Sequence, residues 1–308
     1  MSRLVLVILL LLVSVGVVAS QPQFRASTSL VRLEVSVTDN RGAVLGLGPE
    51  DFVVEDLGAR QSVQIDASVD TPLDLVLVVQ PLTAVAYTSP EQAARLAPSV
   101  SSFLQHVEER DRLGVIVGGT PPTLVRALAF GPPSISLESF VGGEYAAPFD
   151  AIASALREFP PSDRRRALVA FTNAADFRSV IDFDTLADMA RRLGPAFVLV
   201  SAPILVQDTF GAQAEGPGGR SIGVPVDASV SGYIFPARLQ LLAKRTGGIT
   251  VNLGDGDPKV LIKDMFTWLR TRYVISYTPP PGKGWHPVSV KVNRRGATVT
   301  AREGYFVD

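Results

Sequence analysis

Both ends of the chain carry short segments in which apolar and polar residues alternate. Residues 30–39 (LVRLEVSVTD) show this period of two clearly, which predicts a strand with one buried face. Asn40 and Gly42 then supply a turn. The same β character predicts further strands in five segments, 52–55, 61–65, 273–279, 286–292 and 297–306.

The middle of the chain has a different pattern. From Leu73 the run LDLVLVV is almost continuously apolar, which is typical of a parallel strand covered by helices on both faces. A helix is expected to begin at Pro90, because Ser89 is a good N-cap and proline suits the first turn. Repeated strand–helix units predict a Rossmann-like, doubly wound, mostly parallel sheet, an α/β fold. The other expected strands are 113–117, 124–129, 167–172, 196–201 and 250–253, and the other expected helices are 149–158, 183–193, 236–245 and 258–271.

The layout along the chain is therefore a β-rich segment (21–71), an α/β domain (72–272) and a second β-rich segment (273–308). Neither β-rich segment is long enough to bury a core alone. We expect the two to pair with each other into one β-rich module, with the α/β domain inserted between them. A Gly-rich insertion at 207–232 is expected to be either a binding loop or a mobile one.

Residues 1–20 resemble an export signal. Arg3 precedes a long apolar run, and the small residues Ala19 and Ser20 precede Gln21. We expect cleavage after Ser20 and an exported protein that is periplasmic, bound to the cell surface or secreted; an uncleaved anchor is the alternative. No later segment is apolar enough to predict a membrane span.

Composition narrows the function. The 308 residues are 46% hydrophobic and 19% charged, so the chain can bury a core. A formal net charge of −1 argues against nucleic-acid binding. The chain has no cysteine and only two histidines, His106 and His286, which excludes thiol chemistry and leaves little for imidazole chemistry. Since no Gly-x-Ser-x-Gly motif occurs either, we expect no enzyme.

Three motifs carry a family resemblance: VTDNRG at 37–42, EDFVVED at 50–56 and AREGYF at 301–306. Together with the α/β core, they resemble exported bacterial proteins that contain a domain related to von Willebrand factor A. The resemblance implies a Rossmann-like sheet with a site on the loops at the carboxyl ends of the strands. In the family at large this site is a metal-ion-dependent adhesion site, built from Asp-x-Ser-x-Ser, a Thr and an Asp.

The positions that match this adhesion site have lost their ligands. In the first loop, Gln80, Leu82 and Ala84 stand where the family has Asp, Ser and Ser. The Thr position falls on Glu144 or on Ala146, depending on which neighbouring motif fixes the count, and Asn173 replaces the last Asp. Mg²⁺ prefers oxygen ligands that include carboxylate charge. The resemblance therefore implies a degenerate site without metal or cofactor. Glu144 is the only obvious residue whose carboxylate would restore metal binding.

Other candidate sites have simpler interpretations. GPGGRS at 216–221 lacks the spacing of a phosphate loop, and Asp257 before Pro258 is expected to cap a helix rather than to bind calcium. We expect Arg164–Arg166 to be a solvated edge and His106 to lie on the surface. Trp285, beside His286, is expected to pack within the β-rich module.

These observations favour a non-catalytic protein-binding or structural module of the bacterial cell envelope that works without a metal. Its expected partner is a protein of unknown identity that contacts the loops above the sheet. The alternative is a metal-assisted adhesion protein or hydrolase with a non-standard site. Sensitivity to a chelator separates the two.

Overall fold

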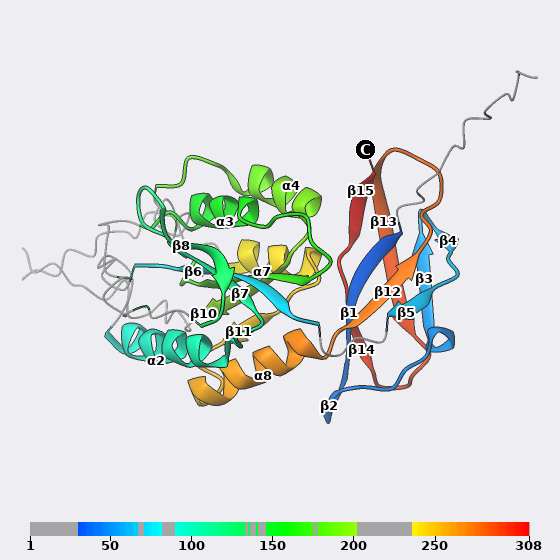
Figure 1. Ribbon diagram of the computed structural model, residues 1–308, viewed down its shortest axis with the longest axis horizontal. Coiled ribbons are helices and arrows are strands. Elements are labelled where there is room, and N and C mark those ends of the chain that lie inside the picture. The colour runs from blue at the N-terminus through cyan, green and yellow to red at the C-terminus, as the bar shows by residue number, and fades with distance from the viewer. Residues whose placement is uncertain are drawn as a thin grey trace, which may run out of the picture.

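The computed structural model describes residues 30–66, 71–81, 90–132, 135, 140, 146–174, 176, 178–201 and 236–307. It has two parts, an α/β domain and an antiparallel β-sandwich, which lie side by side (Figure 1). No helix within these residues is long and apolar enough to cross a membrane. The expected signal (1–20) and the Gly-rich insertion (207–232) lie outside the described residues.

The α/β domain is built on a six-stranded sheet with the order β11-β10-β9-β6-β7-β8. All neighbouring strands are parallel except β7 and β8. This confirms the α/β fold, and the order is that of a doubly wound sheet. The strands are β6 (Leu73–Val79), β7 (Arg112–Val117), β8 (Thr123–Phe130), β9 (Arg165–Phe171), β10 (Ala196–Ser201) and β11 (Thr250–Asn252).

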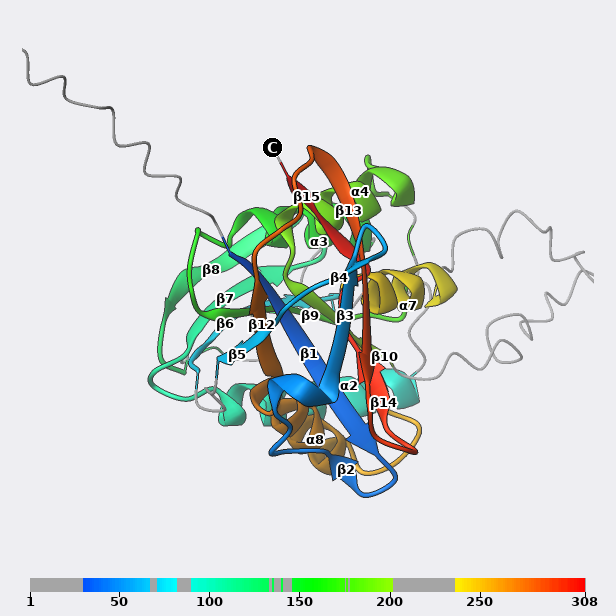
Figure 2. The ribbon, with the colours of Figure 1, turned by 90° about the vertical axis from the view of Figure 1, so that its right-hand side faces the viewer.

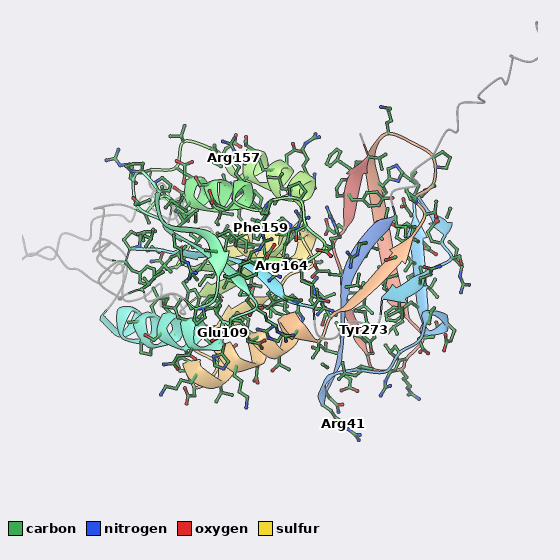
Figure 3. All side chains as sticks on the ribbon, viewed as in Figure 1. Arg41, Glu109, Arg157, Phe159, Arg164 and Tyr273 are labelled. Atoms are coloured by element: carbon green, nitrogen blue, oxygen red, sulfur yellow. The ribbon has the colours of Figure 1, made fainter. Side chains whose placement is uncertain are left out.

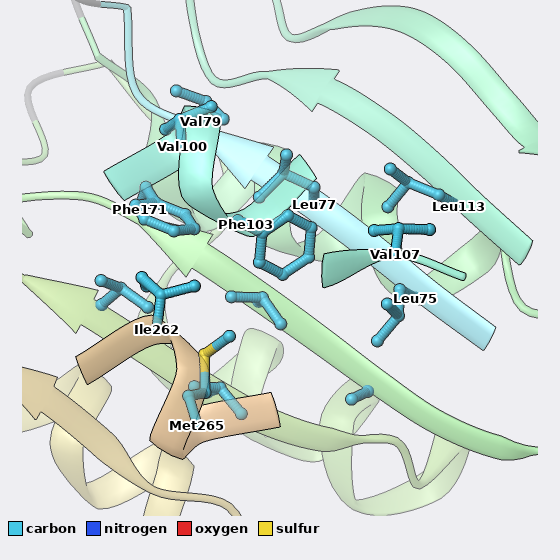
Figure 4. Packing of buried hydrophobic residues seen from close by; sticks show 14 of the residues in the cluster. Leu75, Leu77, Val79, Val100, Phe103, Val107, Leu113, Phe171, Ile262 and Met265 are labelled. Carbon is cyan, nitrogen blue, oxygen red and sulfur yellow. The ribbon is translucent and has the colours of Figure 1, made fainter. Parts of the chain in front are cut away.

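Helices cover both faces of this sheet, which explains the continuous apolar run of β6. Leu75 and Leu77 point to one face, where they pack with Phe103 and Met265 (Figure 4). Val76 and Val78 point to the other face and its own apolar cluster. The helices on the first face are α2 (Pro90–His106) and α8 (Pro258–Arg270), and those on the second are α3 (Pro148–Arg157), α4 (Phe183–Leu193) and α7 (Pro236–Arg245).

Local signals fix the ends of these helices. Asp257 accepts a hydrogen bond from Lys259 N at 2.9 Å and Pro258 opens α8, which confirms the predicted cap. Asp182 caps α4 by accepting from Thr185 N at 2.8 Å. The same helix ends at Gly194, whose φ of 77° is the left-handed conformation that glycine adopts at low cost.

The β-sandwich consists of two antiparallel sheets. One has five strands, in the order β14-β1-β12-β5 with β2 beside β1, and the other has four, in the order β15-β13-β3-β4. A 3₁₀ turn, η1 (Pro49–Asp51), precedes β3. The strands are β1 (Val31–Asp39), β2 (Gly42–Ala43), β3 (Phe52–Asp56), β4 (Ala59–Arg60), β5 (Gln64–Asp66), β12 (Tyr273–Tyr277), β13 (Gly284–Val292), β14 (Thr298–Thr300) and β15 (Gly304–Val307).

Each sheet of the sandwich combines strands from the two ends of the chain. In the first sheet, Leu33 of β1 pairs with Ile275 of β12, and in the second, Val54 of β3 pairs with Val290 of β13. The inward side chains of both sheets form one apolar core. Figure 2 looks onto this sandwich, with the α/β domain behind it.

The amino ends of the parallel strands face the sandwich, and several arginines lie at this junction. The prediction that Arg164–Arg166 forms a solvated edge is wrong. Arg165 is only 3% exposed and donates to the carbonyl oxygen of Arg272 at 2.5 Å. Arg164, on the end of the domain nearer to the sandwich (Figure 3), donates to the buried carboxylate of Asp74 at 2.6 Å. Since Asp74 is 90 positions away in sequence, no local pattern reveals this pairing.

Candidate functional site

The carboxyl edge of the six-stranded sheet contains the point where a doubly wound fold binds its ligands. The strand order reverses direction between β6 and β9, and ligands bind at such a switch point, outside the carboxyl ends of the strands. Gln80 directly follows β6, and Thr172 and Asn173 directly follow β9. The structure thus brings together Gln80 and Asn173, two of the positions that the resemblance matches to an adhesion site.

The side chain of Gln80 ties the two strand ends to each other. It is 4% exposed, and its Oε1 accepts hydrogen bonds from Thr172 Oγ1 at 2.7 Å and from Asn173 N at 3.1 Å. Thr172 Oγ1 in turn accepts from Ala174 N at 3.0 Å. A carbonyl oxygen has two lone pairs, so both acceptor positions of this oxygen are occupied.

The neighbouring part of the edge is the start of α3. Ala146 is 3% exposed, and Ala147 N donates to the carbonyl oxygen of Gly118, at the end of β7, at 3.1 Å. Ala147 cannot cap the helix with its side chain. Instead Ser179 Oγ accepts from both Phe149 N and Asp150 N at 3.2 Å.

Asp150 makes further hydrogen bonds to the same loop and so completes a clamp between α3 and residues 179–181. Its two carboxylate oxygens accept from Val180 N at 2.8 Å and from Ile181 N at 3.0 Å. Backbone groups of a loop are thereby satisfied without water. The side chain of Val180 is nevertheless 91% exposed, so the clamp presents an apolar group to the solvent.

Asp176 is a carboxylate of this edge that the sequence analysis missed. It is 7% exposed, and its Oδ1 accepts from Arg178 N at 3.3 Å and Ser179 N at 3.0 Å. Its buried Oδ2 makes no hydrogen bond in the described part of the chain. An Asp side chain often accepts from the backbone N–H groups two and three residues later in a turn. This local pattern is a sequence signal that could have identified Asp176.

These residues do not fit the magnesium site that the resemblance implies. The oxygen of Gln80 is already used, Ala146 offers no side-chain oxygen, and Asn173 is neutral. No group of three or more His, Cys, Asp or Glu side chains able to hold a metal occurs within the described ranges. Leu82, Ala84 and Glu144 lie outside them.

Neither histidine is fully exposed. His106, which we expected on the surface, is only partly exposed. Its Nδ1 lies 2.8 Å from the Ser102 carbonyl oxygen and its ring stacks on Phe266. His286 is 1% exposed and its Nδ1 lies 3.0 Å from the buried carboxylate of Asp56. Trp285 packs on Phe306 of β15, with 5.2 Å between ring centroids, as expected.

Two tyrosines complete the cluster around Asp56. Tyr277 donates to its Oδ2 at 2.9 Å and Tyr305 at 2.5 Å. Burial, followed by the hydrogen bond to Asp56, raises the pKa of both hydroxyls, which therefore stay protonated as donors. Because the cluster joins β3 to three strands of the C-terminal segment, we assign it a structural role in the sandwich.

No known protein family matches the sequence, and no curated protein matches it. Among solved structures, an aerotolerance-related membrane protein from Bacteroides fragilis NCTC 9343 is 19% identical, with a TM-score of 0.42 over 64% of this chain and 98% of that one. The conserved hypothetical protein BatB from Bacteroides thetaiotaomicron is also 19% identical, with a TM-score of 0.41 over the same shares. The von Willebrand factor type A structure from Catenulispora acidiphila is 11% identical, with a TM-score of 0.45 over 90% of this chain and 73% of that one. At these scores the likeness carries no argument, so the fold assignment rests on the strand order.

Proposed function

We propose that this protein is a non-catalytic binding or structural module whose carboxyl-edge site works without a metal ion. The α/β domain is in this proposal of the von Willebrand factor A type and is inserted in a β-rich module formed by residues 21–71 and 273–308. The observation that carries the proposal is the hydrogen bonding of Gln80.

An amide at the place of a metal-binding carboxylate changes what holds the edge together. In a metal site, the ion would link the strand ends by accepting lone pairs from both. Here the carbonyl oxygen of Gln80 links them directly, by accepting from the Thr172 hydroxyl and the Asn173 backbone. Such a link needs no ion and adds no charge to the edge, which favours contacts with a protein partner over charged ligands.

Export to the cell envelope is part of the same proposal. It is supported by Arg3, the apolar run after it and the small residues Ala19 and Ser20. The periplasm, the cell surface and the medium are all compatible with it. A mature N-terminus at Gln21, found by sequencing protein from the native host, would support a cleaved export signal, and recovery of intact residues 1–20 in the membrane fraction would contradict cleavage and favour an uncleaved anchor.

One observation favours a second candidate, a metal-assisted adhesion protein with a non-standard site. Asp176 holds a buried carboxylate oxygen without a hydrogen bond from the described residues, and a buried carboxylate is costly unless it is paired. A cation there would supply the missing partner. The two candidates differ in whether a chelator abolishes partner binding.

Partner capture tests the proposal. With the full chain as bait and an extract of the native cell envelope, we expect one partner to be retained in the presence of a chelator. Val180→Asp should release it, because this places a charge on the exposed apolar group of the clamp. Val260→Asp is the matched control, since Val260 is also exposed (52%) but lies on α8. Capture that fails with chelator and returns with Mg²⁺ would instead support the metal-assisted candidate.

A further inference from the structure

A cavity of about 100 Å³ lies between the α/β domain and the β-sandwich, far along the strands from the carboxyl-edge site. It has room for several water molecules and hence for one small anion. Both parts of the molecule line it, and its walls carry more positive than negative charge. The positively charged lining residues are Arg32, Arg164, Arg165, Arg166, Arg272 and Arg302, and the negatively charged ones are Glu34 and Asp163.

Three of these six arginines have partners that offset their charge, and a fourth, Arg32, is exposed and donates to the carbonyl oxygen of Asp163 at 3.4 Å. Arg164 pairs with Asp74. Arg272 pairs with Glu34, whose Oε2 lies 2.9 Å from Nη1. Arg165 donates to carbonyl oxygens at the end of α8, including that of Arg270 at 2.7 Å, where the helix dipole favours a cation.

Neither Arg166 nor Arg302 forms an ion pair within the described ranges. Arg302 donates to the carbonyl oxygens of Gly304 and Arg191, at 2.5 and 2.7 Å, and the second oxygen lies in the last turn of α4, which offsets part of its charge as the end of α8 does for Arg165. Arg166 forms neither a side-chain hydrogen bond nor an ion pair with any residue that the structure describes. Their positive charges are therefore balanced by no acidic side chain in direct contact.

The two guanidinium groups also lie next to each other. A β-carbon built on Gly194 would lie 2.7 Å from Arg302 Nη1 and 3.6 Å from Arg166 Nη2, so both groups reach the same point at the end of α4. Burial, and then the neighbouring charge of Arg166, lower the pKa of Arg302 to about 10. Arg302 thus stays charged at neutral pH, and the repulsion between the two groups is a cost that an anion would remove.

We propose that this cavity binds a free divalent oxyanion of the phosphate or sulfate type between Arg166 and Arg302. Arg166 offers its full fork of N–H donors, which matches such an anion in a bidentate manner. Arg302 adds Nη1, because its Nε and Nη2 already donate to carbonyl oxygens. Arg166 belongs to β9 and Arg302 to the segment between β14 and β15. The bound anion therefore bridges the α/β domain and the β-sandwich and stiffens their junction.

Thermal unfolding of the full chain in phosphate-free buffer of low ionic strength tests this. Phosphate or sulfate well above the Kd should raise the Tm by about 4 °C, whereas chloride at the same ionic strength should not. Arg166→Gln should abolish the shift and leave the Tm without phosphate unchanged or higher, because it removes a like-charge contact. Arg157→Gln, which changes an exposed arginine on α3, should keep the shift.

Three results would overturn the proposal. Chloride could reproduce the whole shift, Arg166→Gln could retain it, or Arg166→Gln could lower the Tm in the absence of phosphate, which would make Arg166 a structural residue. If this variant does not fold, calorimetric titration of the unaltered chain with phosphate decides. One-to-one binding supports the site, and absence of heat contradicts it. None of these results depends on the carboxyl-edge proposal.

Discussion

The two edges of the six-stranded sheet stabilise their buried polar groups differently, one with ion pairs and the other with hydrogen bonds between neutral side chains. At the amino edge, Asp74 has a fully buried carboxylate that pairs with Arg112 and Arg164. Asp111 does the same with Arg270, at 2.6 Å. At the carboxyl edge, the corresponding strand ends are joined by the neutral side chains of Gln80 and Thr172.

The difference shows at which edge of the sheet the molecule buries ion pairs. At the carboxyl edge, Gln80 and Asn173 are neutral at positions where the resemblance implies carboxylates. At the amino edge, carboxylates are buried beside arginines, and no sequence motif predicts this. Buried charge is tolerated when fixed partners and hydrogen bonds surround it. The starts of the parallel strands, which face the β-sandwich, provide such partners.

The largest effect is expected from Asp74→Asn. This substitution keeps the shape of the side chain but leaves Arg112 and Arg164, whose side chains are 22% and 17% exposed, without their counter-ion. Removing one partner of a buried pair typically costs 3–5 kcal/mol, and the partial exposure of the arginines places our estimate at about 3 kcal/mol. Urea unfolding measures it.

The control for this prediction is an exposed ion pair. Asp188 and Arg192 on α4 lie 2.9 Å apart, and both side chains are about half exposed. Asp188→Asn should therefore cost no more than about 0.5 kcal/mol. Equal losses for the two variants would show that the amino edge gains nothing from burying its carboxylates.

A smaller effect is expected at the carboxyl edge from Gln80→Met. Methionine fills a similar volume but offers no carbonyl oxygen, so the Thr172 hydroxyl and the Asn173 N–H lose their acceptor. We expect a loss of about 2 kcal/mol in the free energy of unfolding.

A double-mutant cycle separates this hydrogen bond from packing. Thr172→Val removes one of the two donors to the Gln80 oxygen. If the link is real, the double variant Gln80→Met with Thr172→Val is less destabilised than the sum of the two single variants. Additive losses would mean that Gln80 stabilises this edge through packing alone.

Local patterns predicted the elements of the α/β domain well. The run LDLVLVV predicts a strand buried on both faces, and β6 has helices on each side of it. The expected helix at 258–271 matches α8 (Pro258–Arg270), because Asp257 and Pro258 signal its start directly. Such signals are local, so neighbouring residues suffice to find them.

Side-chain roles that depend on distant residues could not be predicted in this way. Three consecutive arginines look like a solvated edge until the strand order places Asp74 and the end of α8 beside them. His286 likewise meets Asp56 across 230 positions. At the carboxyl edge, the resemblance identified Gln80 and Asn173, but only the structure shows that an oxygen of one accepts from the backbone of the other.

The smallest expected effect is that of divalent cations, which should be none. We expect chelator-treated protein titrated with Mg²⁺, Mn²⁺ or Ca²⁺ to give no binding heat and no change in Tm. Mg²⁺ gives up its water shell reluctantly, and carboxylate charge is what makes protein oxygens competitive with that water. Gln80 and Asn173 supply no such charge, and the Gln80 oxygen is already engaged by two donors.

The double variant Gln80→Asp with Asn173→Asp restores both carboxylates, so Mg²⁺ should stabilise this variant and leave the unaltered chain unchanged. A one-to-one binding event of micromolar affinity in the unaltered chain, abolished by Asp176→Asn or Glu144→Ala, would show that a carboxylate outside the family positions has taken over the metal, and the neutral interpretation of this edge would fail.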